Sequence, residues 1–179
     1  PFEVSVAMLT ATGVDGASLA QATEGLDLLE IPYSSGSDAN SALVGGHCDL
    51  YVCGWDDIAG LVESGDIVPI LALCENRMSI APDLQCSVEN GIDSVMGPWR
   101  GIFAKKGTPQ EAIDTLVAAI EEAKQSDTWK EFTHNAAYDE RPIPAPGEET
   151  AEFCHNEYKD LHDYMVEQGT LVKDYDDLK

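Results

Sequence analysis

Positively charged residues are scarce in this chain, and its first 76 residues contain none. Ten Lys and Arg face 33 Asp and Glu, which gives a formal net charge of −23. A field of that sign repels nucleic acid and anionic lipid headgroups, so neither is an expected partner. Because the first cation is Arg77, backbone amides and hydroxyl groups would have to hold any anion bound within residues 1–76. The acidity itself suits a salty medium or a secreted surface and identifies no ligand.

Long apolar runs and metal-type cysteine pairs are also missing. No stretch of about 18 apolar residues occurs, so we expect no direct membrane insertion. The sequence starts at Pro1 without a charged and apolar leader, and we expect any targeting segment to lie outside it. No C-x-x-C motif occurs, which argues against zinc and thioredoxin-like chemistry. The five cysteines are Cys48, Cys53, Cys74, Cys86 and Cys154.

Cys74 and Cys86 leave two alternatives open. In an oxidising compartment they could form a disulfide, and otherwise they would remain packed free thiols. His155 and His162 are seven residues apart on a predicted helix, but no third ligand stands at matching spacing. We therefore expect neither a metal site nor a cofactor.

Short apolar strands alternate with helices in the first half of the chain. Small-residue loops separate them, and Gly45 with Gly46 ends one helix. This alternation predicts an α/β fold with a parallel-rich sheet flanked by helices. The predicted strands cover residues 2–9, 28–33, 48–53 and 67–73, and the predicted helices cover 19–22, 38–44 and 56–62.

The second half is predicted to be mainly helical after one more strand at residues 99–104. Thr108, Pro109 and Glu111 have the spacing of an N-cap, a first helical residue and the end of a capping box. A smaller helix should start at Asp127. A long last helix, residues 148–168, is predicted to turn an apolar stripe toward a core. That stripe comprises Ala151, Cys154, Tyr158, Leu161 and Met165.

Five short blocks of sequence occur in an order typical of one family. Each block alone is weak evidence for a family, but five blocks in this order and at suitable spacing are specific evidence. Together they resemble the tripartite tricarboxylate transporter (TctC-type) receptor family, also called Bug proteins. The blocks are residues 31–36, 42–50, 63–67, 81–83 and 99–109, which read IPYSSG, ALVGGHCDL, ESGDI, APD and WRGIFAKKGTP.

The resemblance implies a two-lobed, periplasmic-binding-protein-like (type II) fold that closes on a carboxylate. In such proteins, backbone amides and hydroxyls from loops of both lobes hold the ligand. Family members carry a further N-terminal segment that builds most of the first lobe. Residues 1–97 would then form the second ligand-binding lobe. Residues 98–179 would return to complete the first lobe, whose N-terminal part is absent from this sequence.

Three loops after predicted strands are candidates for ligand binding. In the first, N–H groups and threonine hydroxyls lie at a helix N-terminus, where the dipole favours a carboxylate by about 0.3–1 kcal/mol. Alternatively, Gly13 and Gly16 only permit a tight turn there, and Ser34, Ser35 and Gly36 are ordinary turn residues. The candidate ligand-binding residues are Thr10, Thr12, Gly13, Ser34, Ser35, Gly36, Cys53 and Gly54.

Cys53 bears on the kind of ligand. The family resemblance implies that an acidic residue often stands there and could pair with an amino group. Its replacement disfavours an amino acid and leaves di- or tricarboxylates and related acids. Cys53 could also be an inert buried thiol, and the following Trp55 could either cover the cleft or pack against the lobe.

These observations predict an extracytoplasmic receptor rather than an enzyme. It would deliver a small organic carboxylate to the membrane permease subunits of a tripartite transporter. Its location would be periplasmic or extracellular, with a lipid anchor on a segment outside this sequence as one option. The alternative is a ligand-sensing effector module of a regulatory protein with the same lobe architecture. Carboxylate pairs are too common in so acidic a chain to indicate catalysis.

Overall fold

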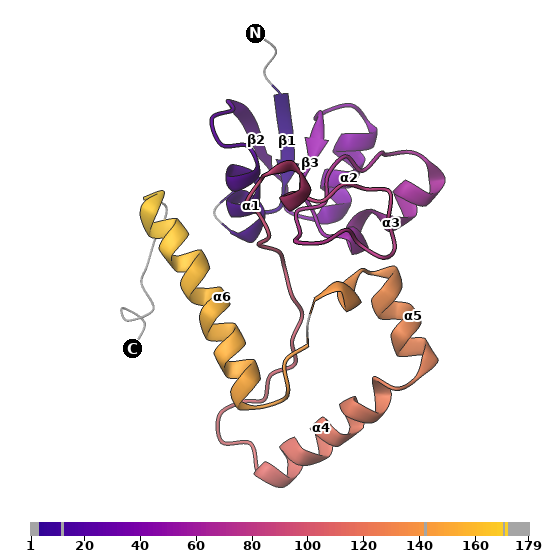
Figure 1. Cartoon of the computed structure of the whole chain (residues 1–179), viewed down its shortest axis with the longest axis vertical. Helices are drawn as coiled ribbons and strands as arrows, with labels where there is room; N and C mark the ends of the chain where they lie inside the picture. The colour runs from indigo at the N-terminus through magenta and orange to yellow at the C-terminus, as the bar shows by residue number, and fades with distance from the viewer. Residues whose placement is uncertain (1–3, 12, 142, 170, 172–179) are drawn as a thin grey trace.

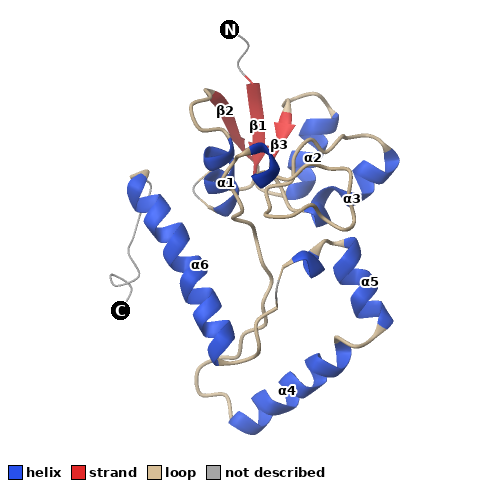
Figure 2. Ribbon diagram, viewed as in Figure 1, coloured by secondary structure: helices blue, strands red, loops and turns tan. Residues whose placement is uncertain are grey.

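The computed structural model describes residues 4–11, 13–141, 143–169 and 171, and its first part is a small α/β lobe (Figures 1 and 2). Strands and helices alternate there, as the sequence predicts. The elements are β1 (Val4–Met8), α1 (Val14–Ala22), β2 (Leu28–Pro32), α2 (Gly36–Val44), β3 (Leu50–Tyr51) and α3 (Trp55–Ser64).

The sheet has three parallel strands in the order β2-β1-β3. β1 pairs with β2 along its full length, from Val4 opposite Leu28 to Met8 opposite Pro32. β3 is shorter than predicted because only two of its residues pair with β1. Single backbone hydrogen bonds from Asp49 to Ser5 and from Val52 to Ala7 extend that contact on both sides.

The core lies on both faces of β1. Side chains alternate between the faces of a strand, so Val6 and Met8 pack with Leu19 of α1, whereas Ala7 packs on the α2 side. All three strand residues are fully buried. The second cluster contains Ala39, Ala42 and Cys48 beside Ala7. Small side chains on this side allow α2 to approach the sheet closely.

Hydrogen bonds of three buried serines connect residues 87–96 to α1. The Ser87 hydroxyl donates to the carbonyl of Ser94 at 2.6 Å, and the Ser94 hydroxyl donates to that of Ser18 at 3.0 Å. Ser18 in turn donates to the carbonyl of Met96 at 2.7 Å. Since all three serines are buried, these bonds satisfy polar groups that water does not reach.

Two predicted strands are wrong. Residues 67–73 form an irregular segment with one isolated bridge between Ala72 and Cys86, and Val68 and Ile70 are 79% and 68% exposed. Pro69 has no N–H to donate to a sheet. Residues 99–104 also form no strand. Within the described chain, no other strand lies beside them to complete a ladder.

The start of α4 (Gln110–Ala123) differs from the predicted capping box. Pro109 is the N-cap, and no side chain of the described residues caps the helix. The Thr108 hydroxyl instead donates to the Lys105 carbonyl at 2.8 Å. Thr108 therefore stabilises the turn before the helix rather than the first helical N–H groups.

The remaining helices are α5 (Asp127–Asn135), the short η2 (Tyr138–Glu140) and α6 (Glu148–Glu167). With α4 they form an extended arm, in which α4 is the most distant from the lobe and α5, η2 and the upper end of α6 approach it (Figure 1). Neither α4 nor α6 contains a buried residue in the described chain, although α6 contacts α1. The expectation of a core-facing stripe on α6 is therefore wrong for this chain. Tyr158, one member of the stripe, is 43% exposed.

The central strand should dominate the stability of the lobe. Met8→Ala removes a fully buried side chain, so we expect the free energy of unfolding to fall by about 2–5 kcal/mol. Leu26→Ala is the matched control, because Leu26 is 67% exposed and its loss should change stability by less than about 0.5 kcal/mol. Urea unfolding followed by circular dichroism measures both. Equal losses would contradict the assignment of Met8 to the core.

Candidate ligand-binding edge of the sheet

The carboxyl ends of β1, β2 and β3 meet at one edge of the lobe, which we call the carboxyl edge (Figure 1). From this edge a short loop leads to the N-terminus of α1, of α2 and of α3. Helix N-termini carry unpaired N–H groups and a partial positive charge, and open parallel sheets bind ligands at such edges. All described candidate residues lie in these three loops or in the first turn that follows.

The first loop folds back over the start of α1. Gly16 donates its N–H to the Thr10 carbonyl at 3.2 Å, and a Cβ atom on Gly16 would overlap the carbonyl oxygen of Ala11. Gly13 is the N-cap residue, and a Cβ there would overlap the Thr10 hydroxyl. Close approach to backbone therefore requires glycine at Gly16, whereas at Gly13 a Cβ would displace the Thr10 side chain. Thr12, also a candidate, lies outside the described residues.

The second loop caps α2. Ser35 is the N-cap, and its hydroxyl accepts the Asp38 N–H at 3.1 Å and donates to the Asp38 carboxylate at 2.8 Å. Ser34 donates to the same carboxylate at 3.2 Å. Both hydroxyls therefore have a protein partner in Asp38.

Gly36 brings the second and third loops together. A Cβ atom at Gly36 would lie 3.1 Å from an Asp57 carboxylate oxygen and 3.4 Å from the Tyr51 hydroxyl. The Asn40 side-chain amide donates to the Asp57 carbonyl at 2.9 Å. The Tyr51 hydroxyl is buried without a hydrogen-bond partner among the described atoms. Close packing of α2 against α3 thus joins two of the three candidate loops.

The surroundings of Cys53 disfavour a thiolate. Burial raises the pKa of its thiol to about 12, and the nearby carboxylates of Asp57, Asp15 and Asp56 add to the rise. A thiolate is the form that attacks effectively, so this environment works against a nucleophilic role. This environment fits the sequence-based alternative of an inert thiol.

The sequence analysis missed three aspartates at the carboxyl edge. Burial is the main cause that raises the pKa values of Asp15 and Asp57, and each is raised further by a neighbouring aspartate. Asp56 and Asp57 occupy the first turn of α3, where acidic residues commonly favour the helix dipole. Because acidic residues are common at helix starts, the sequence alone did not single these aspartates out as part of the candidate site.

The second half of the chain supplies a cation to this edge. Arg100 contacts the Asp56 carboxylate at 3.3 Å, and the Tyr138 hydroxyl donates to the same carboxylate oxygen at 2.7 Å. The Arg100 guanidinium also lies 5.6 Å from the centre of the Tyr138 ring. The lack of cations before Arg77 is thus partly offset by a residue more than forty positions along the chain from Asp56.

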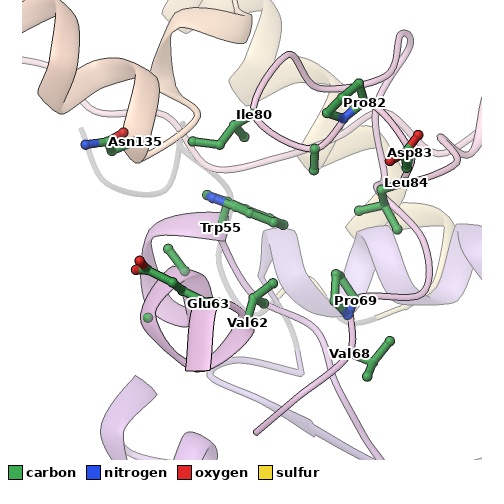
Figure 3. A pocket seen from close by; sticks show the side chains of 13 residues that line it. Trp55, Val62, Glu63, Val68, Pro69, Ile80, Pro82, Asp83, Leu84 and Asn135 are labelled. Carbon is green, nitrogen blue, oxygen red and sulfur yellow. The ribbon is translucent and has the colours of Figure 1, made fainter. Parts of the chain in front are cut away.

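A pocket of about 850 Å³ lies beside α3, next to the third loop (Figure 3). Trp55 is the first residue of α3 and lines it, together with Val62 and the turn from Ile80 to Leu84. The indole N–H of Trp55 is buried without a partner among the described atoms. None of the described candidate residues lines this pocket.

Neither a metal centre nor an activated hydroxyl is built from the described residues. They contain no group of three His, Cys, Asp or Glu side chains that could hold a metal. Ser79, His134 and Asp139 lie together, but the same ring nitrogen of His134 faces both partners, at 3.5 and 3.1 Å. A catalytic triad needs both nitrogens of the ring, one toward each partner.

Comparison with known families identifies the chain. The model of the family described as "Tripartite tricarboxylate transporter family receptor" (TctC) matches residues 5–168. The chain belongs to this family. The family resemblance read from the five sequence blocks is therefore confirmed. TctC-family members are solute-binding receptors and not enzymes.

Curated relatives are distant and longer than this TctC-family chain. BugT of Bordetella pertussis is 28% identical over 156 residues, which cover 87% of this chain and 47% of BugT. A UPF0065 protein from the gbd 5' region of Cupriavidus necator is 28% identical over 131 residues, 73% of this chain and 39% of that protein. The chain thus spans less than half the length of both.

Solved structures share the fold. MatC from Rhodopseudomonas palustris, solved with malate, has a TM-score of 0.71 at 22% identity, over 90% of this chain and 56% of MatC. A second R. palustris protein, solved with adipate, has a TM-score of 0.79 at 18% identity, over 94% and 57%. The periplasmic binding protein BugD has a TM-score of 0.78 at 23% identity, over 93% and 57%. The predicted α/β, periplasmic-binding-protein-like fold class is confirmed.

The helices of the described residues were also compared with the length and hydropathy of a membrane span. In that part of the TctC-family chain, no helix is long and apolar enough to cross a bilayer.

The tight first loop yields a test of close approach. Gly16→Ala should destabilise the protein by about 1–3 kcal/mol, because the new methyl group meets the rigid carbonyl of Ala11. Gly60→Ala is the matched control in α3, where a Cβ would meet nothing within 4 Å; it should stabilise the helix by about 0.5–1 kcal/mol. Thermal unfolding of both variants gives the comparison. A stabilised Gly16→Ala protein would disprove the described loop geometry.

Asp15 provides a pH-dependent test. Since burial raises its pKa in the folded protein, the ionised carboxylate destabilises the fold above that raised value and is harmless below the unfolded value of 3.8. Asp15→Asn should therefore raise Tm at about pH 7.5 and have a smaller effect near pH 4. Asp27→Asn, at an exposed position, is the control and should show no such trend. A gain in Tm that grows toward acid pH would contradict the burial of Asp15.

Proposed function

We propose that this chain is part of an extracytoplasmic receptor that binds a small organic carboxylate, a di- or tricarboxylate or a related acid. The receptor would deliver it to the membrane permease subunits of a tripartite tricarboxylate-type transporter. The observation that carries the proposal is the convergence of three strand-to-helix loops, each at a helix N-terminus, in a TctC-family chain. Two structural relatives were solved with malate and with adipate.

We also propose a division of the chain into two parts. Residues 1–97 would form the second ligand-binding lobe, and residues 98–179 would return to the first lobe and complete it. Exposed apolar side chains in the second part support this: Ile102 is 75%, Phe103 69% and Leu116 55% exposed. Such surface is usually covered in a stable protein. The remainder of the first lobe would cover it.

The proposed ligand contacts are the candidate residues of the three loops: Thr10, Thr12 and Gly13, then Ser34, Ser35 and Gly36, then Cys53 and Gly54. Amides and hydroxyls would receive one carboxylate, and the Ser34 and Ser35 hydroxyls would turn from Asp38 to the ligand. The aspartates of the carboxyl edge limit how much negative charge it accepts, since like charges repel. Arg100 would offset part of that repulsion. Closure of the two lobes would then shield the bound acid.

The proposed location is the periplasm or the extracellular space. BugD, a periplasmic binding protein, shares the fold. A lipid anchor on a segment outside this sequence would keep the receptor at the membrane. The high negative charge suits a secreted protein that must remain soluble near its partners.

Calorimetry on the full-length receptor tests the function. We expect saturable binding to one member of a panel of malate, adipate, citrate and aromatic acids, and weaker or no binding of amino acids. Ser34→Ala should reduce the affinity at least about tenfold, because it removes a hydrogen bond to a charged group. Ser41→Ala is the control, since that hydroxyl bonds to the Ser37 carbonyl within α2. No saturable heat with any acid, or equal affinities of the two variants, would count against the proposal.

A further inference from the structure

A loop from Cys74 to Cys86, here called the 74–86 loop, forms one wall of the pocket beside α3 (Figure 3). An isolated parallel bridge joins Cys86, at the end of the loop, to Ala72, two residues before the loop begins. Ala72 donates its N–H to the Gln85 carbonyl at 2.9 Å and accepts the Ser87 N–H at 2.8 Å. Backbone hydrogen bonds therefore hold the base of the loop together.

Both cysteine thiols point into the same turn at this base. The Cys74 thiol donates to the Asn76 carbonyl at 3.0 Å, and the Cys86 thiol lies 3.6 Å from the carbonyl of Glu75. The two sulfur atoms thus contact the carbonyls of adjacent residues. The Ser87 hydroxyl donates to the Cys74 carbonyl at 3.1 Å, which holds the backbone of Cys74 against the residue that follows Cys86.

The other three cysteines are placed differently. Cys48 lies in the core between β1 and α2, Cys53 at the carboxyl edge and Cys154 on α6. Only the pair of Cys74 and Cys86 combines thiols that contact one turn with a backbone bridge beside that turn.

We propose that Cys74 and Cys86 form a disulfide that closes the 74–86 loop when the receptor folds outside the cytoplasm. Each thiol loses its proton, one S–S bond forms, and the two electrons pass to an external disulfide, which is reduced to two thiols. The inference rests on the proposed extracytoplasmic function for its oxidising compartment. The bond would pin the pocket wall formed by residues 80–84 to the lobe.

The reactivity of the Cys74 thiol determines the pH at which the disulfide forms readily. Burial raises the pKa of the Cys74 thiol to about 11, so little thiolate is present at neutral pH. Uncatalysed exchange with oxidised glutathione should therefore be slow near neutrality and should accelerate with rising pH, because the thiolate is the attacking species. A bond formed at this partly shielded position would likewise resist reduction by external thiols.

Peptide mapping of the whole chain tests the pairing. The protein is secreted into an oxidising compartment or treated with oxidised glutathione, then denatured at acid pH with an alkylating agent and digested. We expect one cross-linked species joining the peptides of Cys74 and Cys86, with Cys48, Cys53 and Cys154 alkylated. Five alkylated cysteines, or a cross-link between any other pair, would overturn the inference.

Thermal unfolding supplies a second measurement. Reduction should lower the Tm of the oxidised protein by about 5–10 °C, because the closed loop restricts the unfolded chain. Cys154→Ser should keep this dependence on reductant, whereas Cys86→Ser should lose it. Should Cys86→Ser fail to fold, Cys74→Ser gives the same comparison at the less buried position.

The outcome is separable from that of the proposed function. A receptor that binds an acid but yields five free thiols disproves the disulfide alone. A cross-linked protein that binds no acid of the panel supports the disulfide and counts only against the proposed ligand class.

Discussion

β1 is hydrogen-bonded on both sides by strands that run in its own direction, and this parallel pairing determines where every loop of the lobe lies. Parallel strands must be joined by a crossover that returns to the same end of the sheet. The two crossovers are α1 and α2, and α3 follows the carboxyl end of β3, so all three helices start at the carboxyl edge. The convergence of the three candidate loops follows from the strand order rather than from any attraction between the loops.

The two parts of the chain contribute groups of different charge to the carboxyl edge. The first part of the chain offers helix N-termini, hydroxyls and aspartates, and the second part brings Arg100. The carboxylates of Asp15 and Asp57 have raised pKa values because burial disfavours their ionised form. If an acid binds at this edge, as we propose, oriented N–H groups at short range would have to stabilise it, while the wider field opposes its approach.

Local sequence patterns predicted most helices and the first strands, but not every strand, for a physical reason. β1, α2 and α6 start and end near their predicted residues, and α5 starts at the predicted Asp127, since their apolar patterns and caps are local. Residues 67–73 and 99–104 have strand-like composition, but a strand also needs a neighbour, which no local pattern supplies. At the candidate site, the loops were predictable from strand order. The contacts of Asp56 with Arg100 and Tyr138 were not, because they join positions far apart in the chain.

The hydrogen bonds of the buried serines also constrain the two segments that connect the lobe with the arm. Ser18 anchors Met96, and Arg141 donates to the carbonyl of the next residue, Gly97, at 2.9 Å. The outgoing connector is thereby hydrogen-bonded to the lobe at Met96, and the returning connector is hydrogen-bonded to the outgoing one at Gly97. A rotation of the arm relative to the lobe that keeps these hydrogen bonds would move both connectors together.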